Sequence, residues 1–175
     1  MTVSQVKAYD HGRAVKHLHE RTLPPRALRL PEQLLDSQVA YADRTTRVRF
    51  TNRLAAGQVI VDVDVGAHRG APPMRGQLVL DTRGAAQVVN LPFAHGSIYS
   101  HKVMGPVTGE LVIGDDRHAL DGGAGVLDDH KGYYPYVMHN DWVTSLWRGD
   151  DGLVRGFNLT RNQCLNPARW NENCV

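Results

Sequence analysis

The chain has 175 residues, of which 42% are apolar and 22% charged, and its formal net charge is +2. This length suits a single domain with its own core, and the composition excludes general disorder. No run of about 18 apolar residues is present, so we expect no transmembrane segment. The charged N-terminus lacks the apolar stretch of a signal peptide. The 16 Arg residues are scattered, so no nucleic-acid partner is predicted. Two cysteines without CxxC spacing indicate reduced thiols, and we expect a cytoplasmic protein.

Residues 1–44 differ in pattern from the rest and are expected to form an N-terminal extension that is partly helical or irregular. Their apolar residues fit a helical stripe only in part, and prolines then interrupt it. The residues concerned are Val6, Tyr9, Val15, Leu18, Pro24, Pro25 and Pro31.

From residue 45 the apolar period becomes two. Between Val59 and Val65 every second residue is valine and two of the others are Asp62 and Asp64, as in a half-buried antiparallel strand. Similar strands recur about every ten residues, and Gly149-Asp150-Asp151-Gly152 predicts a hairpin. Residues 45–175 are therefore predicted to form a mostly β domain, an antiparallel barrel or sandwich. The further strands expected are 46–50, 77–82, 86–91 (paired with 77–82 through a turn at Arg83-Gly84), 106–113, 141–148 and 153–159.

Acidic, histidine and aromatic residues gather between Leu127 and Trp147. Acid–base groups beside aromatic walls suit proton transfer to an apolar substrate, because the aromatic faces stabilise developing positive charge. A structural role is the alternative, in which Asp128 and Asp129 cap a turn and the aromatic residues pack in the sheet. The candidate catalytic residues are Asp129, His130, His139 and Asp141, and the candidate ligand-binding residues are Tyr133, Tyr134 and Trp142.

Other motifs exclude several kinds of site. Asp129-His130 with His139-x-Asp141 has suitable residue types for a metal, but its spacing matches no ligand motif, so no metal is predicted. The nucleophile and phosphate-binding motifs are absent, and no cofactor is expected. His101 and Lys102 are further candidate ligand-binding residues in a stretch expected to be a surface loop between two strands.

Several motifs in this order resemble the bacterial domain-of-unknown-function family DUF2804, over about residues 45–175. The family is distantly similar to a lipocalin-like group that includes carotenoid 1,2-hydratases. In that group an Asp-His pair precedes a Trp-containing strand and a Gly-containing hairpin, as Asp129-His130 and Trp142 do here. The motifs are Lys102 with Gly105 and Gly109, Asp128-Asp129-His130-x-Gly132-Tyr133-Tyr134-Pro135, Asp141-Trp142, Asp151-Gly152, Gly156-Phe157-Asn158-Leu159 and Glu172-Asn173.

The resemblance implies a lipocalin-like domain that acts on an unsaturated lipophilic molecule by acid-catalysed hydration or isomerisation, without a cofactor. Family members are longer, so the chain is expected to be truncated at its C-terminus and its barrel to be incomplete. Two alternatives stay open: a non-catalytic module that binds a lipid or another apolar ligand, and an inactive fragment. Unpaired strand edges of an incomplete barrel would favour homo-association.

Overall fold

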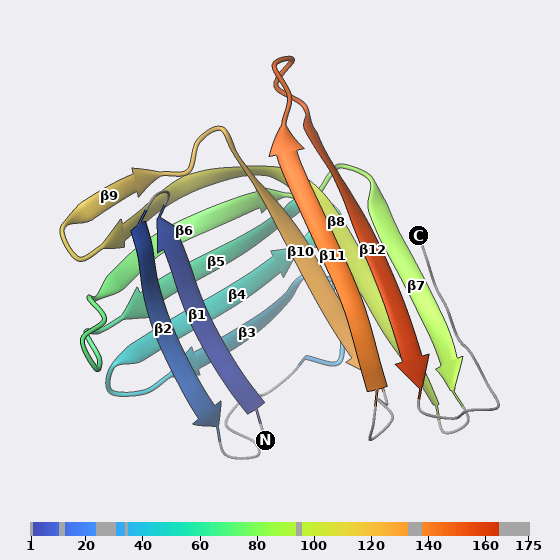
Figure 1. Ribbon diagram of the computed structural model, residues 1–175, viewed down its shortest axis with the longest axis horizontal. Helices are drawn as coiled ribbons and strands as arrows, with labels where there is room; N and C mark the ends of the chain where they lie inside the picture. The colour runs from blue at the N-terminus through green and yellow to red at the C-terminus, as the bar shows by residue number, and fades with distance from the viewer. Residues whose placement is uncertain are drawn as a thin grey trace. The chain divides into compact units, whose positions relative to one another are not determined.

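The computed structural model describes residues 2–10, 13–23, 31–33, 35–93, 96–132 and 138–164. Within these ranges, residues 2–10, 13–23, 91, 93, 138–141 and 160–164 are described by their backbone alone. The described chain is mostly β and antiparallel (Figure 1). This confirms the predicted fold class. The chain also has a short 3-10 helix, η1 (Leu54–Ala56). The chain divides into two compact units, one of Met1–Val79 and Val107–Asp121 and the other of Leu80–Pro106 and Gly122–Val175.

The first strands of the first unit form a hairpin. β1 (Thr2–Asp10) and β2 (Arg13–Leu23) pair antiparallel in a two-stranded sheet of their own. This hairpin replaces the partly helical or irregular segment that the sequence led us to expect. The partial helical stripe was a weak signal, because pairing with the adjacent strand overrides a sparse local pattern. β3 (Ser37–Ala42) also precedes residue 45, so β structure begins before the expected domain boundary.

The alternating pattern of the first unit is confirmed. β3, β4 (Thr46–Arg53), β5 (Gln58–Val65) and β6 (Met74–Asp81) are successive neighbours in the sheet. On one face, Val63, Val65 and Met74 form a buried core. On the other face, arginines of β4 oppose aspartates of β5, with ion pairs of 3.6 Å for Arg47–Asp64 and 3.1 Å for Arg49–Asp62.

The longest strand, β8 (Gly96–Ile113), passes through both units. In the first unit it pairs with β9 (Asp116–Ala119), and in the second with β7 (Ala86–Phe93). The expected surface loop at His101 and Lys102 is therefore a strand, in which polar residues are compatible with pairing because alternate positions face opposite sides. The expected pairing through Arg83-Gly84 is also wrong, because β7 pairs with β8 and β6 is a neighbour of β5 and β8.

In the second unit, β10 (Gly123–Gly132) is a neighbour of β8, and β11 (Met138–Arg148) pairs with β12 (Val154–Cys164). The predicted turn between β11 and β12 is confirmed: the Gly149 amide donates to the Leu153 carbonyl at 2.9 Å, and Gly152 has a φ of 76°. Residues directly opposite each other share a face of this hairpin. One face therefore carries Trp142, Thr144 and Asn158, and the other carries Val143, Trp147, Phe157 and Leu159.

Candidate functional site

Four polar side chains of β8 and β10 form a connected cluster in the second unit. Ser100 and Lys102 are two residues apart on β8, as are Asp128 and His130 on β10, so each pair shares a face of its strand. The Lys102 Nζ lies 2.9 Å from Asp128 Oδ2. The His130 Nε2 lies 2.5 Å from Asp128 Oδ1 and 3.3 Å from Ser100 Oγ. We call these four residues the acid–base cluster.

Exposure increases along the acid–base cluster from Lys102 to His130. The side chain of Lys102 is 7% exposed, that of Asp128 18% and that of His130 42%. A buried ammonium needs a counter-charge, because an unpaired charge away from water is costly. Asp128 supplies that charge with one carboxylate oxygen and contacts His130 with the other. The imidazole is thus the part of the cluster that a molecule from solvent can reach.

Trp142 covers the buried end of the cluster. Its ring centroid lies 4.4 Å from Lys102 Nζ, within the range of a cation–π interaction. The Trp142 Nε1 donates to Asn158 Oδ1 at 2.5 Å, and Thr144 Oγ1 donates to the same oxygen at 2.8 Å. Asn158 Nδ2 in turn donates to Gln87 Oε1 on β7 at 3.3 Å. The hairpin and the β7–β8 pair are therefore joined by polar contacts beside the cluster.

The contacts of His130 do not form a serine hydrolase triad. In a serine hydrolase triad, the serine and the carboxylate contact different ring nitrogens, so that the histidine can take the serine proton. Here Asp128 and Ser100 both contact Nε2. When that nitrogen carries its proton and donates to Asp128, it cannot accept the proton of Ser100. In that tautomer the acceptor nitrogen of the ring is Nδ1 and not the nitrogen near Ser100.

The sequence matches the family model described as Domain of unknown function (DUF2804) over residues 1–175. The chain belongs to this family. The match confirms the resemblance found in the sequence and extends it to residues 1–44. No curated protein and no solved structure matches the DUF2804 chain significantly. Among its described residues, no helix is long and apolar enough to cross a membrane.

The structure brings together three of the residues singled out in the DUF2804 sequence: Lys102, His130 and Trp142. Asp129 does not join them, because it alternates with Asp128 and His130 along β10 and so lies on the opposite face, as His101 does on β8. The His101 Nδ1 is buried and has no hydrogen-bond partner within the described residues. His139 and Asp141 lie on β11 with only their backbone described, and Tyr133 and Tyr134 lie outside the described residues.

Sequence reasoning missed several members of the network, chiefly Asp128 and Asn158. The signal for Asp128 was present, because the residue that shares a face with His130 on a strand is two positions away, not one. No comparable signal in the sequence points to Asn158, Thr144, Gln87 or Ser100, because their roles depend on which strands lie together.

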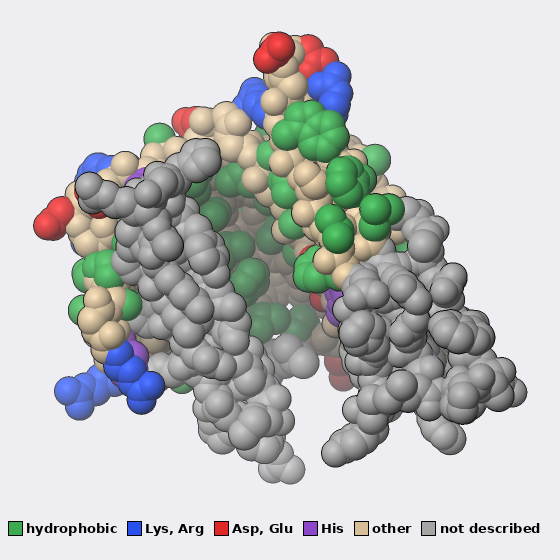
Figure 2. Space-filling model, in the orientation of Figure 1, with side chains coloured by type: hydrophobic (Ala, Val, Ile, Leu, Met, Phe, Trp, Pro, Cys, Tyr) green, Lys and Arg blue, Asp and Glu red, His purple; other side chains and the backbone are tan. Residues whose placement is uncertain are grey.

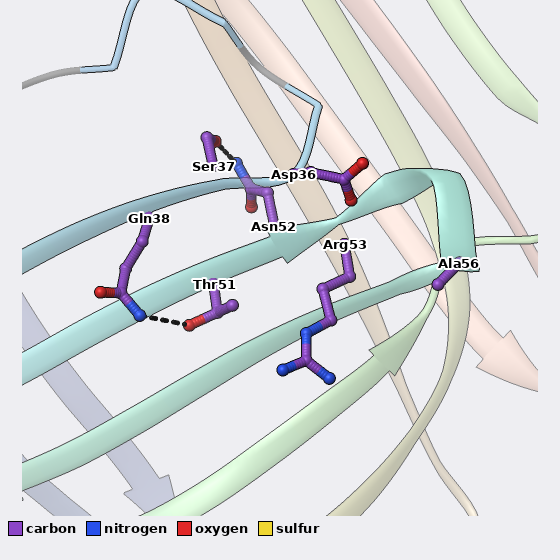
Figure 3. A pocket seen from close by; sticks show the side chains of 7 residues that line it. All are labelled: Asp36, Ser37, Gln38, Thr51, Asn52, Arg53 and Ala56. Atoms are coloured by element: carbon purple, nitrogen blue, oxygen red, sulfur yellow. Dashed lines mark hydrogen bonds between the residues drawn. The ribbon is translucent and has the colours of Figure 1, made fainter.

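Two other features of the described residues do not extend the site. No group of three or more His, Cys, Asp or Glu side chains gathers there as a metal-binding set would. A cavity of about 260 Å³ lies in the first unit, at the start of β3 and the end of β4 (Figure 3). Four of its polar side chains pair with one another: Gln38 donates to Thr51 and Asn52 donates to Ser37, each at 3.2 Å. It contains none of the predicted site residues.

Proposed function

We propose that this DUF2804 chain transfers a proton to and from an unsaturated lipophilic molecule, with hydration or isomerisation as the outcome. The observation that carries the proposal is the half-exposed His130 held by Asp128, whose second oxygen pairs with the buried Lys102. Asp128 contacts one ring nitrogen and so orients the imidazole, and proton transfer requires a group positioned in this way. Lys102 fixes the carboxylate from the buried side.

The proposed step is balanced without a cofactor. Protonated His130 gives its proton to one carbon of a double bond, and the neighbouring carbon becomes cationic. Water then adds to that carbon and loses a proton to the imidazole, which completes hydration. Loss of a proton from an adjacent carbon instead completes isomerisation. Neither route changes the net oxidation state of the substrate, so no redox partner is needed.

Trp142 supports an apolar substrate for this site. The residue is 53% exposed although its ring also covers Lys102, so part of the indole is available as an apolar wall. An indole face also stabilises a nearby cationic carbon. Tyr133 and Tyr134 remain proposed wall residues. His139 and Asp141 also remain candidates for a second proton-transfer group, because they precede Trp142 on β11.

Deuterium incorporation tests the proposal without knowledge of the product. The protein is incubated in D₂O with an unsaturated fatty acid, a linear isoprenoid or a carotenoid, and the lipids are analysed by mass spectrometry. We expect carbon-bound deuterium with at least one of them, and at least about a 100-fold loss of rate in His130→Gln. His118→Gln, on β9 of the first unit, is the matched control and keeps the native rate. Equal rates in His130→Gln and the native protein, or no incorporation into any of the three lipids, would contradict the proposal.

Binding of a lipid without catalysis is the second candidate, and a different observation favours it. Val143, Trp147, Phe157 and Leu159 share one face of the hairpin and are each between 44% and 55% exposed. Figure 2 shows hydrophobic side chains gathered over β11 and β12. Patches of this kind mark binding surfaces. Native mass spectrometry with a fatty acid should then show a complex that Trp147→Ser abolishes and His130→Gln retains. The reverse pattern would place the lipid at the acid–base cluster.

A further inference from the structure

We infer that Asn158 is a positioning residue that holds Trp142 over Lys102 and so closes the buried side of the acid–base cluster. The inference rests on the proposed function, since it assigns a part to the same site. Asn158 is 8% exposed, in contrast to Trp142 at 53%. The Asn158 amide is buried and has specific partners, whereas the Trp142 indole is exposed. Asn158 is therefore the residue that its surroundings hold in place.

Asn158 makes hydrogen bonds both within the β11–β12 hairpin and to the β7–β8 strand pair. Within the hairpin its Oδ1 accepts from Thr144, which lies directly opposite, and from Trp142, which is two residues from Thr144 on the same face. Its Nδ2 leaves the hairpin and donates to Gln87 on β7. Gln87 is the direct cross-strand partner of Lys102 in the β7–β8 pair. Asn158 therefore ties the indole to the strand pair that carries the buried lysine.

Close packing on the same face supports this docking. A Cβ added to Gly156, two residues before Asn158, would collide with the Met104 Sδ of β8. The absence of a side chain at Gly156 lets β12 approach β8 beside Lys102. Asn158 and Gly156 thus act together, one as the polar contact and the other as the close approach.

The consequence concerns water at Lys102. Trp142 is too exposed to be held by packing alone, so its Nε1 hydrogen bond is the contact that fixes the ring plane. Without Asn158 the ring would turn, and water and small reagents would reach Lys102. The Lys102–Asp128 pair would then be solvated and weaker, because solvent reduces the attraction between charges. Asp128 would hold His130 less firmly, and turnover would fall.

Amine labelling tests this directly, because the chain has only 4 Lys residues. The folded protein is treated with acetic anhydride, and the acetylation of each lysine is followed by peptide mass spectrometry, with the exposed Lys131 as the internal reference. We expect Lys102 to react at least about tenfold faster in Asn158→Leu than in the native protein, since local opening exposes protected groups. Lys131 should not change. Asn90→Leu, an exposed asparagine of β7, is the matched control and leaves Lys102 protected.

The conservative variant Asn158→Asp should keep Lys102 protected, because a carboxylate accepts from Trp142 and Thr144 and the Gln87 amide can turn to donate. Trp142→Phe serves if Asn158→Leu does not fold: it keeps an aromatic ring and lacks the Nε1 donor, so Lys102 labelling should rise by about threefold or more. A protected Lys102 in a folded Asn158→Leu or in Trp142→Phe would overturn the inference. So would native deuterium incorporation in Asn158→Leu. Failure of the proposed function would appear separately, as unchanged turnover in His130→Gln or as no incorporation by the native protein, with the labelling pattern intact.

Discussion

Asp128 holds two partners of different exposure, and this asymmetry sets the cost of losing each partner. Asp128→Asn leaves the buried Lys102 ammonium without its counter-charge, which we expect to lower the free energy of unfolding by roughly 3–5 kcal/mol. Lys102→Met should cost less, because Asp128 keeps His130 and some contact with solvent. The double variant should recover much of the loss of Asp128→Asn. Urea unfolding of the four proteins measures these differences.

The ion pair Arg47–Asp64 is the control for this cycle. Its side chains are 76% and 63% exposed and its atoms lie 3.6 Å apart, so Asp64→Asn should cost less than about 1 kcal/mol. Costs of Asp128→Asn and Lys102→Met that simply add in the double variant would show that the two residues are not coupled.

A second prediction at the residue scale concerns Asp81 and the stability of the protein at low pH. The Arg83 side chain, by hydrogen bonding, lowers the pKa of Asp81 from 3.8 to about 2. A carboxyl whose pKa is lower in the folded state stabilises the fold above its unfolded pKa, and this contribution is lost as the pH falls through the folded pKa. The stability difference between the native protein and Asp81→Asn should therefore shrink between pH values of about 4 and about 2. Urea unfolding across this range measures the difference. The stability difference between the native protein and Arg83→Gln should shrink over the same pH range, because this variant lacks the hydrogen bond that lowers the pKa of Asp81. A constant difference would contradict the assignment.

At the scale of elements, the hairpin β11–β12 depends on a position without a side chain. A Cβ at Gly156 would lie 2.6 Å from the Ser145 carbonyl oxygen, in addition to its collision with Met104. Since Ser145 belongs to the paired strand, its backbone cannot move freely, and Gly156→Ala should lower the free energy of unfolding by about 1–3 kcal/mol. Gly66→Ala is the control, because its Cβ would come no closer than 3.4 Å to the Thr45 carbonyl oxygen. Equal effects of the two substitutions, measured by urea unfolding, would contradict this reading.

The strands and turns show how much of the fold could be predicted from the sequence. The period of two identified β4 and β5, and the Asp-Gly signal identified the β11–β12 turn, because both are local consequences of strand geometry. Pairing partners were not predictable: β6 and β7 look like a hairpin across Arg83-Gly84, yet β7 pairs with β8. The residues of the site divide in the same way, into those with a local signal and those that depend on strand pairing. His130, Lys102 and Trp142 were identified by residue type, whereas Asn158 required knowledge of which strands lie together.

At the scale of the whole molecule, the strand order ends at β3, and this edge underlies the expected homo-association. Within the described residues no strand pairs with the other edge of β3. Its sequence, Ser-Gln-Val-Ala-Tyr-Ala, has no charged residue and no proline, the devices by which exposed edges usually avoid pairing. We therefore expect a concentration-dependent dimer formed by antiparallel pairing of β3 with β3 of a second copy.

Light scattering after size-exclusion chromatography measures this association. Ala40→Lys places a charge in the middle of β3 at an exposed position and should shift the protein to a monomer, because two such charges would meet across the new strand pair. Ala55→Lys adds the same charge at an exposed position in η1 and should leave the dimer unchanged. A native protein that is monomeric at all concentrations would refute the association. Dimerisation of Ala40→Lys at the native concentration would move the interface to another surface, for which the apolar face of the β11–β12 hairpin is the next candidate.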